Sequence, residues 1–179
     1  VVDYKIGNIK IPDLKAIMTG QKSEKYPEVI TPDKHDNVVV FWCGHGAKNS
    51  LMWGSDEVVH GYQIADLIQS MTYRKMLWSM DACYSGTIGE ACIGIPGLLV
   101  ITSANAYEPS KADMKDPEMG IWLSNGFTRE FQETVDAKPD IILRDLYYEL
   151  ARNTVGSHTT VYNVENYGNM YKEHMDEYF

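Results

Sequence analysis

Two residues of this chain could act together in catalysis, one as a nucleophile and the other by transferring protons. Each of the two follows an apolar run. His45 stands between two glycines after the run 38–43, and Cys83 follows the run 76–80 in the stretch Asp-Ala-Cys-Tyr-Ser-Gly. Short β-branched and aromatic runs are typical of buried strands in a parallel sheet. If the two strands are parallel neighbours, His45 and Cys83 emerge side by side at their carboxyl ends, where open α/β sheets bind ligands. A thiol beside an imidazole is the arrangement that nucleophilic catalysis needs.

The other two cysteines indicate no chemistry of their own. Cys43 ends the first run, and we expect it to pack in the core. Cys92 is expected in a loop shortly after the nucleophile, where it is either redox-active or simply exposed, and we assign it no role. Three cysteines do not make a disulfide framework, and no Cys-x-x-Cys pair or histidine cluster indicates a zinc site.

A strand–helix–strand unit is expected to position the two reactive residues. Its parts are a strand at 38–43, a helix at 61–71 and a strand at 76–81, joined by a right-handed crossover. A short strand at 51–54 and a small hairpin arm at 56–60 precede that helix. Before this unit we expect a helix at 12–20 and a loop at 21–37. After it, the chain is predicted as a strand at 98–104, a polar connection at 105–120, helices at 121–135 and 141–153, a short strand at 159–162, and a polar surface helix or tail at 165–179.

Composition places the chain among ordinary globular domains. Its 179 residues suffice for one domain, 1–179, with a real core. Subtracting 25 acidic residues from 16 basic ones gives a net charge of −9, which argues against nucleic acid as the main partner. No apolar run approaches the length of about 18 residues that a membrane span needs, so we expect no membrane span.

The sequence around the two reactive residues resembles the caspase-like cysteine peptidases. That clan carries a His-Gly after one strand and an acidic-x-Cys after the next, and Cys83 follows His45 here by 38 positions. Within the clan, the legumain family is the most similar. The resemblance covers most of the chain and is carried by the segments 44–46, 73–76, 81–86, 102–105 and 167–169 together with Glu108 and Ser110.

The resemblance implies both a fold and a set of catalytic roles. The fold is an α/β, caspase-like three-layer sandwich in which helices flank a mostly parallel sheet. Cys83 would be the nucleophile and His45 the general acid and base. The backbone N–H groups of Gly46 and Cys83 would form the oxyanion hole. No cofactor or metal is implied, and the partner would be a peptide or protein substrate.

The implied specificity pocket is only partly retained. Asp81 stands where legumain has an acidic residue, and Ser110 matches a pocket serine. A second pocket acid is replaced by Ile121, and the neighbouring Trp122 could line the pocket. Asp81 fits a carboxamide, and it fits a basic side chain equally well, as in the metacaspases. We therefore expect a polar or basic residue, Asn or Lys/Arg, at the substrate position P1.

The family pattern also begins with a strand and a helix that have no counterpart before Val1. We expect this chain to be the larger, C-terminal part of the fold and an N-terminal fragment of the same precursor to be its partner, since natural proteins avoid open sheet edges. Family members are often made as zymogens and are exported, vacuolar or lysosomal. Two alternatives stay open: a transamidase or peptide ligase that uses the same acyl-enzyme, and a catalytically silent binding domain.

Overall fold

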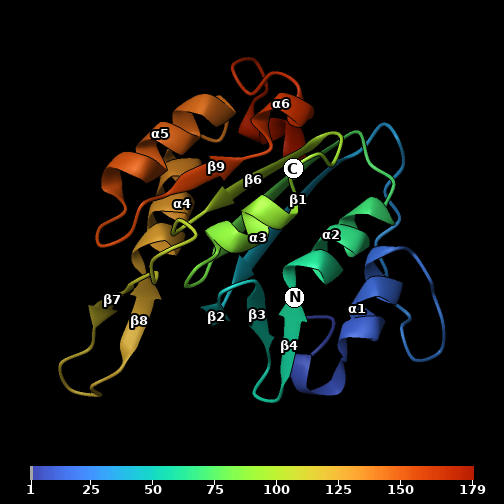
Figure 1. Cartoon of the computed structure of the whole chain (residues 1–179), viewed down its shortest axis with the longest axis horizontal. Helices are drawn as coiled ribbons and strands as arrows, with labels where there is room; N and C mark the ends of the chain where they lie inside the picture. The colour runs from blue at the N-terminus through green and yellow to red at the C-terminus, as the bar shows by residue number, and fades with distance from the viewer. Residues whose placement is uncertain (1) are drawn as a thin grey trace.

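A four-stranded sheet forms the centre of the computed structural model, which describes residues 2–179 (Figure 1). Its strand order is β1 (Asn37–Cys43), β5 (Lys75–Asp81), β6 (Leu98–Thr102) and β9 (Thr160–Tyr162). The pairs β1–β5 and β5–β6 are parallel, whereas β9 runs antiparallel to β6. The predicted mostly parallel α/β sheet flanked by helices is confirmed.

Two small antiparallel sheets and the helices surround this sheet. One small sheet has the order β2-β3-β4, and the other is the hairpin β7–β8, which projects from the body (Figure 1). The short strand predicted at 51–54 and the arm predicted at 56–60 form the two strands of one hairpin, β3 and β4. The bounds are η1 Ile6–Asn8, α1 Ile11–Met18, β2 Gly46–Ala47, β3 Ser50–Trp53, β4 Glu57–His60, α2 Gly61–Gln69, α3 Gly86–Ala91, β7 Ala112–Lys115, β8 Trp122–Asn125, α4 Gly126–Ala137, α5 Leu143–Asn153, α6 Val164–Tyr167 and η2 Met175–Tyr178.

The central strand β5 separates two hydrophobic cores. Alternate residues of a strand point to opposite faces. Met76, Trp78 and Met80 accordingly join the first core, beneath α1, α2 and α3. Leu77 joins the second core, beneath α4 and α5. Because both faces are covered, β5 is buried from Met76 to its end. The molecule therefore has three layers, with helices on both sides of the sheet.

Helix α2 follows the predicted apolar pattern. Ile64, Leu67 and Ile68 recur at the spacing of one helix face, and all three are buried. The backbone N–H of His60 donates to Oε1 of Gln63 at 2.9 Å, which satisfies one free N–H group at the start of the helix. The helix connects β4 to β5 and supports the strand that leads to Cys83.

The segment 105–135 differs from the prediction. Residues 112–115 form β7 within the expected polar connection, and residues 122–125 form β8 where a helix was expected. The side chains of Ile121, Trp122 and Leu123 are 52–57% exposed, so they do not form the inward face that a helix needs. Helix α4 begins only at Gly126, after extended backbone at Asn125.

The C-terminal segment is also packed more deeply than predicted. Instead of a polar surface tail, residues 165–179 place Tyr167, Met170, Met175 and Tyr178 in the second core. The hydroxyl groups of Tyr167 and Tyr178 are 2.6 Å apart and share a hydrogen bond. The aromatic residues that look like tail residues in the sequence therefore close one side of the molecule.

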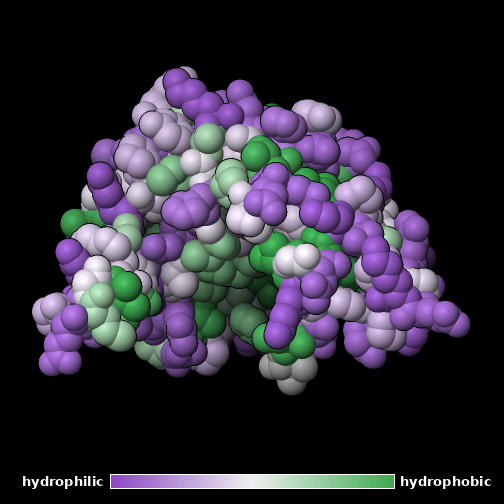
Figure 2. Space-filling model, turned by 90° about the horizontal axis from the view of Figure 1, so that it is seen from below, coloured by the Kyte–Doolittle hydropathy of each residue, from purple (hydrophilic) through white to green (hydrophobic). Residues whose placement is uncertain are grey.

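Strand β1 leaves apolar surface open. Among the described strands it pairs only with β5, and its side chains are half-buried or exposed, with Phe41 39% exposed. Seen from below, the molecular surface is hydrophilic around its margin and hollowed near its centre, where hydrophobic residues line the recess (Figure 2). Within residues 2–179, no helix is both long and apolar enough to cross a membrane.

Candidate active site

The parallel register of β1 and β5 brings His45 and Cys83 together. Cys43 pairs with Asp81, so the two strands end at the same level. The backbone N–H of Gly44 donates to the carbonyl oxygen of Asp81 at 3.0 Å and keeps the two exits adjacent. His45 and Cys83 then line one pocket of about 360 Å³. The full lining of this pocket is Gly44, His45, Asp81, Ala82, Cys83, Ser110, Lys111, Ala112 and Asn125.

Gly46 lies against the backbone of Cys83. A Cβ atom at Gly46 would overlap the carbonyl oxygen of Cys83 and lie 3.0 Å from Cβ of Ala82. Only glycine permits such a close approach of two backbone segments. The backbone N–H of Met52 in β3 donates to the carbonyl oxygen of His45 at 2.9 Å, which fixes the exposed histidine beside the pocket.

Cys83 stands at a sharp turn between β5 and α3. The next residue, Tyr84, has a φ of 56°, in the left-handed region that residues other than glycine rarely adopt. The half-buried thiol of Cys83 donates to the carbonyl oxygen of Ser110 at 3.6 Å. The backbone N–H of Tyr84 donates to the carbonyl oxygen of Glu108 at 2.9 Å. The loop after β6 therefore holds the turn at Cys83 and Tyr84 from the side.

Asp81 is a buried carboxylate held from two elements. Its Oδ1 accepts a hydrogen bond from the hydroxyl of Ser110 at 2.9 Å. Its Oδ2 accepts from the hydroxyl of Thr128 at 2.6 Å and from the backbone N–H of Thr128 at 3.1 Å. Thr128 lies in the first turn of α4, where the helix dipole also favours negative charge. These contacts bring together Asp81 and Ser110, the two pocket residues that the family pattern retains.

Sequence reasoning missed Thr128, Lys111 and Asn125. Thr128 was not predicted because the helix was expected to begin near residue 121, which places Thr128 in the middle of the helix rather than at its amino end. Lys111 and Asn125 stand at the base of the hairpin β7–β8, which was expected to be loop and helix. The only available signal was Asn125-Gly126, a pair that is common where a helix begins or a turn occurs.

Ile121 and Trp122 lie outside the pocket, contrary to the expectation that they line it. In the hairpin, Ala112 pairs with Asn125 at the base, while Lys115 pairs with Trp122 further out. The ammonium group of Lys115 is 5.9 Å from the centre of the Trp122 ring. Both expected pocket residues are more than half exposed, because the β-hairpin carries them away from the sheet edge.

The two remaining cysteines are also placed differently from the prediction. Cys43 is exposed instead of packed in the core, and its sulfur accepts a hydrogen bond from the side-chain amide of Asn125 at 3.3 Å. Partial desolvation of the sulfur, with a smaller contribution from the charge of Asp81, raises the pKa of the Cys43 thiol. Cys92 is fully buried in the first core, and burial raises the pKa of its thiol to about 12. Cys92 is therefore a core residue.

Comparison with known proteins agrees with this geometry. Residues 1–177 match the model of the Peptidase C13 family. The chain is 22% identical over 161 residues to the GPI-anchor transamidase of Bos taurus, covering 85% of this chain and 40% of the relative. It is 23% identical over 155 residues to the GPI-anchor transamidase of Homo sapiens, covering 82% and 39% of the two chains.

A second kind of relative appears in the same comparison. The chain is 26% identical over 175 residues to the legumain of Mus musculus, covering 93% of this chain and 39% of the relative. The chain thus spans about two fifths of the length of these curated relatives. Because the family match extends over nearly every residue, this chain belongs to the Peptidase C13 family, a family of cysteine peptidases that includes legumain and the GPI-anchor transamidases.

Proposed function

We propose that this chain carries the catalytic site of a cysteine endopeptidase. The observation that supports this most directly is the pocket that His45 and Cys83 share at the carboxyl ends of two paired parallel strands. Cys83 passes its thiol proton to His45, attacks the carbonyl carbon of the scissile peptide bond as a thiolate and forms a tetrahedral intermediate. The backbone N–H groups of Gly46 and Cys83 donate to the oxygen on which negative charge develops.

His45 acts on the leaving group in this proposal. Collapse of the intermediate breaks the C–N bond, His45 protonates the departing amine, and a thioester to Cys83 remains. Water, activated by the neutral imidazole, then hydrolyses the thioester and regenerates the thiol. In the resting structure the thiol donates to the carbonyl oxygen of Ser110 rather than to His45, which suits a histidine that works mainly on the amine.

The P1 side chain would enter beside Asp81 and Ser110. Asp81 presents negative charge, whereas Lys111 lines the same pocket with positive charge, so this pair leaves the pocket close to neutral. A neutral pocket with donors and acceptors suits the carboxamide of Asn, and the Asp81 carboxylate also suits Lys or Arg. We therefore propose a polar or basic P1 residue.

Cleavage of a positional peptide library tests both the nucleophile and the specificity. The wild-type protein and the variants Cys83→Ala and Cys43→Ala would be incubated with the library, and the products would be identified by mass spectrometry. Cuts that persist in Cys43→Ala and vanish in Cys83→Ala are expected, and the residue before each cut gives P1. Cleavage that survives in Cys83→Ala would contradict the assigned nucleophile.

Transfer of the acyl group to an amine is the second candidate function. It is supported by the relatives named GPI-anchor transamidase. Both functions share the thioester and differ in whether water or an amine attacks it. Adding glycinamide at increasing concentration to the cleavage reaction would separate them. A transamidase would convert most of the acyl product into the amide, whereas a hydrolase would still release mainly the free acid.

We further propose that a strand from an N-terminal fragment of the same precursor pairs with the open edge of β1. The half-exposed side chains of β1 and the exposed ring of Phe41 support this, since exposed edges of this kind invite pairing. Co-expression of this chain with its upstream segment should give a complex that purifies together and melts at a higher temperature than the chain alone. Separate elution of the two pieces would contradict the proposal.

A further inference from the structure

The loop between β6 and the hairpin β7–β8 touches the nucleophile turn at several points. Its backbone accepts a hydrogen bond from the N–H of Tyr84 at Glu108 and from the thiol of Cys83 at Ser110. The hydroxyl of Ser110 also donates to Asp81. Any movement of this loop would therefore shift both the nucleophile and the pocket wall.

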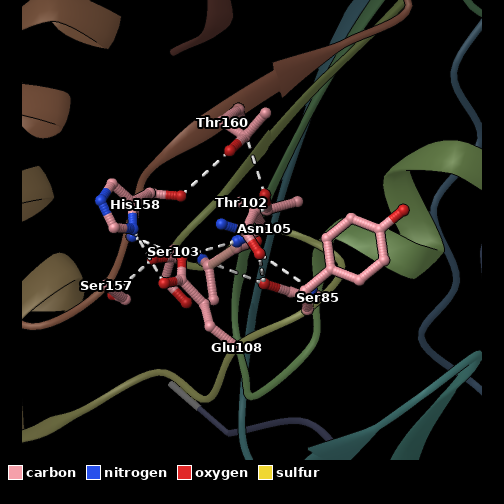
Figure 3. Close-up of polar contacts among 10 residues, drawn as sticks. Ser85, Thr102, Ser103, Asn105, Glu108, Ser157, His158 and Thr160 are labelled. Atoms are coloured by element: carbon pink, nitrogen blue, oxygen red, sulfur yellow. Dashed lines mark hydrogen bonds and ion pairs between the residues drawn. The ribbon is translucent and has the colours of Figure 1, made fainter.

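One carboxylate ties this loop to the strand on its other side. Oε1 of Glu108 accepts from the backbone N–H of Asn105 at 3.1 Å and from the backbone N–H of His158 at 2.7 Å. Oε2 of Glu108 and Nδ1 of the His158 ring are 2.8 Å apart. Figure 3 shows Glu108 and His158 pointing toward each other across the gap between the loop and the segment that leads into β9.

The serines beside this pair complete the connection to the nucleophile. The hydroxyl of Ser157 donates to the carbonyl oxygen of Ser103 at 2.6 Å, and the hydroxyl of Ser103 accepts from the backbone N–H of Ala82 at 3.2 Å. Ser85 likewise contacts the backbone of Ala104 through two hydrogen bonds of 3.3 Å (Figure 3). The turn that carries Cys83 and the start of β9 are thus joined through one polar network.

From this network we propose that Glu108 and His158 form a positioning pair whose charge holds the loop beside Cys83. The pair thereby determines the lowest pH at which the enzyme stays active. The inference deepens the proposed function and rests on it. Neither residue lines the pocket, so both act through the loop. The exposure of the pair is unequal, with 81% of the His158 side chain and 21% of the Glu108 side chain accessible to solvent, so the imidazole can be replaced without leaving a cavity.

The charges around the pair favour the carboxylate form of Glu108. Burial alone would raise the pKa of Glu108, but the hydrogen bonds from His158 and Asn105 outweigh it and hold the pKa below its usual value. Burial raises the pKa of Tyr162 on β9, and the charge of Glu90, with smaller effects from the neighbouring Tyr107 and Glu108, raises it further. With its pKa raised, Tyr162 adds no negative charge beside the pair in acid.

The direction of the pH effect follows from that lowered pKa. A carboxylate with a depressed pKa in the folded protein stabilises its surroundings above its ordinary pKa, and this contribution is lost as the pH falls through the lowered value. Removing His158 returns the pKa of Glu108 toward its usual value. The loop would then loosen at a higher pH than in the wild-type protein.

The test compares profiles of kcat/KM against pH for the full chain and three variants. His158→Ala removes the partner, His158→Arg restores a permanent cation, and Glu149→Gln breaks the distant Lys138–Glu149 pair of 3.2 Å as a matched control. His158→Ala is expected to move the acidic limb to higher pH and to lower kcat/KM there about threefold, a typical size for an exposed ion pair. His158→Arg should restore the wild-type limb, and Glu149→Gln should leave it unchanged.

A profile of kcat/KM against pH for His158→Ala that superimposes on the wild-type profile would overturn the proposal. A second measurement keeps this test separate from the proposed function: the rate at which a dipyridyl disulfide, which reacts with thiols in acid, modifies Cys83, with Cys43 in the same molecule as reference. In acid, the ratio of the modification rate of Cys83 to that of Cys43 should differ between His158→Ala and the wild-type protein at the same pH. If no peptide is cut by any variant, the proposed function fails, and this ratio alone decides on the pair.

Discussion

At the scale of single residues, the three cysteines differ sharply in reactivity. Cys92 is fully buried and burial raises the pKa of its thiol to about 12, whereas Cys43 is exposed and Cys83 faces the pocket. Because the thiolate is the reactive form, iodoacetamide should modify Cys43 and Cys83 in the native protein and Cys92 only after unfolding. Peptide mapping by mass spectrometry measures this. Native labelling of Cys92 at the rate of Cys43 would contradict its placement in the core.

Gly46 offers a second test at this scale. In Gly46→Ala the added methyl would overlap the carbonyl oxygen of Cys83, so the backbone beside the proposed nucleophile must shift. Because small misplacements of reacting groups are costly, we expect kcat to fall about tenfold or more. Gly7→Ala is the control, since its added methyl meets no atom within 4 Å. Equal activity of both variants would show that Gly46 does not approach the nucleophile as described.

Residue types and spacing predict His45 and Cys83 as site candidates, because each follows an apolar run that forms a strand. Asp81 and Ser110 were candidates only through the resemblance to the legumain family. Thr128 could not be found this way, because its contact with Asp81 spans 47 positions and depends on where α4 begins. The exposure of Cys43 was likewise hidden, since it depends on the open edge of β1 rather than on the apolar run itself.

At the scale of elements, the sequence predicts strands with apolar runs better than it predicts the hairpin β7–β8. The runs at 38–43 and 76–81 form β1 and β5. Burial on both faces demands the continuous apolar run of β5, whereas β1, with a similar run, stays half-buried or exposed. The run at 121–123 is also apolar but remains exposed, since among the described strands β8 pairs only with β7. Composition reports that a segment is apolar, whereas its partners decide whether it is helix or strand.

The packing of α3 on β9 leads to a prediction for Gly89. A methyl group there would come within 2.6 Å of Cγ in the Tyr162 ring. Alanine favours the helix by about 1 kcal/mol, but overpacking costs about 1–3 kcal/mol, so Gly89→Ala should lower the Tm by a few degrees. In a Tyr162→Leu background the same change should cost much less. Thermal denaturation of the four proteins measures this, and equal losses in both backgrounds would rule out the contact.

At the scale of the whole molecule, the C-terminal segment closes the second core. Met175 is fully buried there, and Arg74 binds Glu177 at 2.9 Å beside the start of β5. The polar composition of 165–179 concealed this role, because a few large side chains provide the burial while their neighbours stay in water. The same segment also contacts β1 through the bond of 3.0 Å from the Asn37 side chain to the carbonyl oxygen of Glu177. The segment thus braces the amino ends of the two strands that lead to the site.

A pair of variants near the C-terminus tests this bracing. Met175→Ala removes a fully buried side chain and should lower the free energy of unfolding by about 2–5 kcal/mol. Phe179→Ala, four positions later, removes a ring that is 80% exposed and should change it by less than about 0.5 kcal/mol. Urea denaturation followed by tryptophan fluorescence measures both values. If the segment were only a surface tail, the two variants would be equally stable, and the amino ends of β1 and β5 would have to be held in register by the sheet alone.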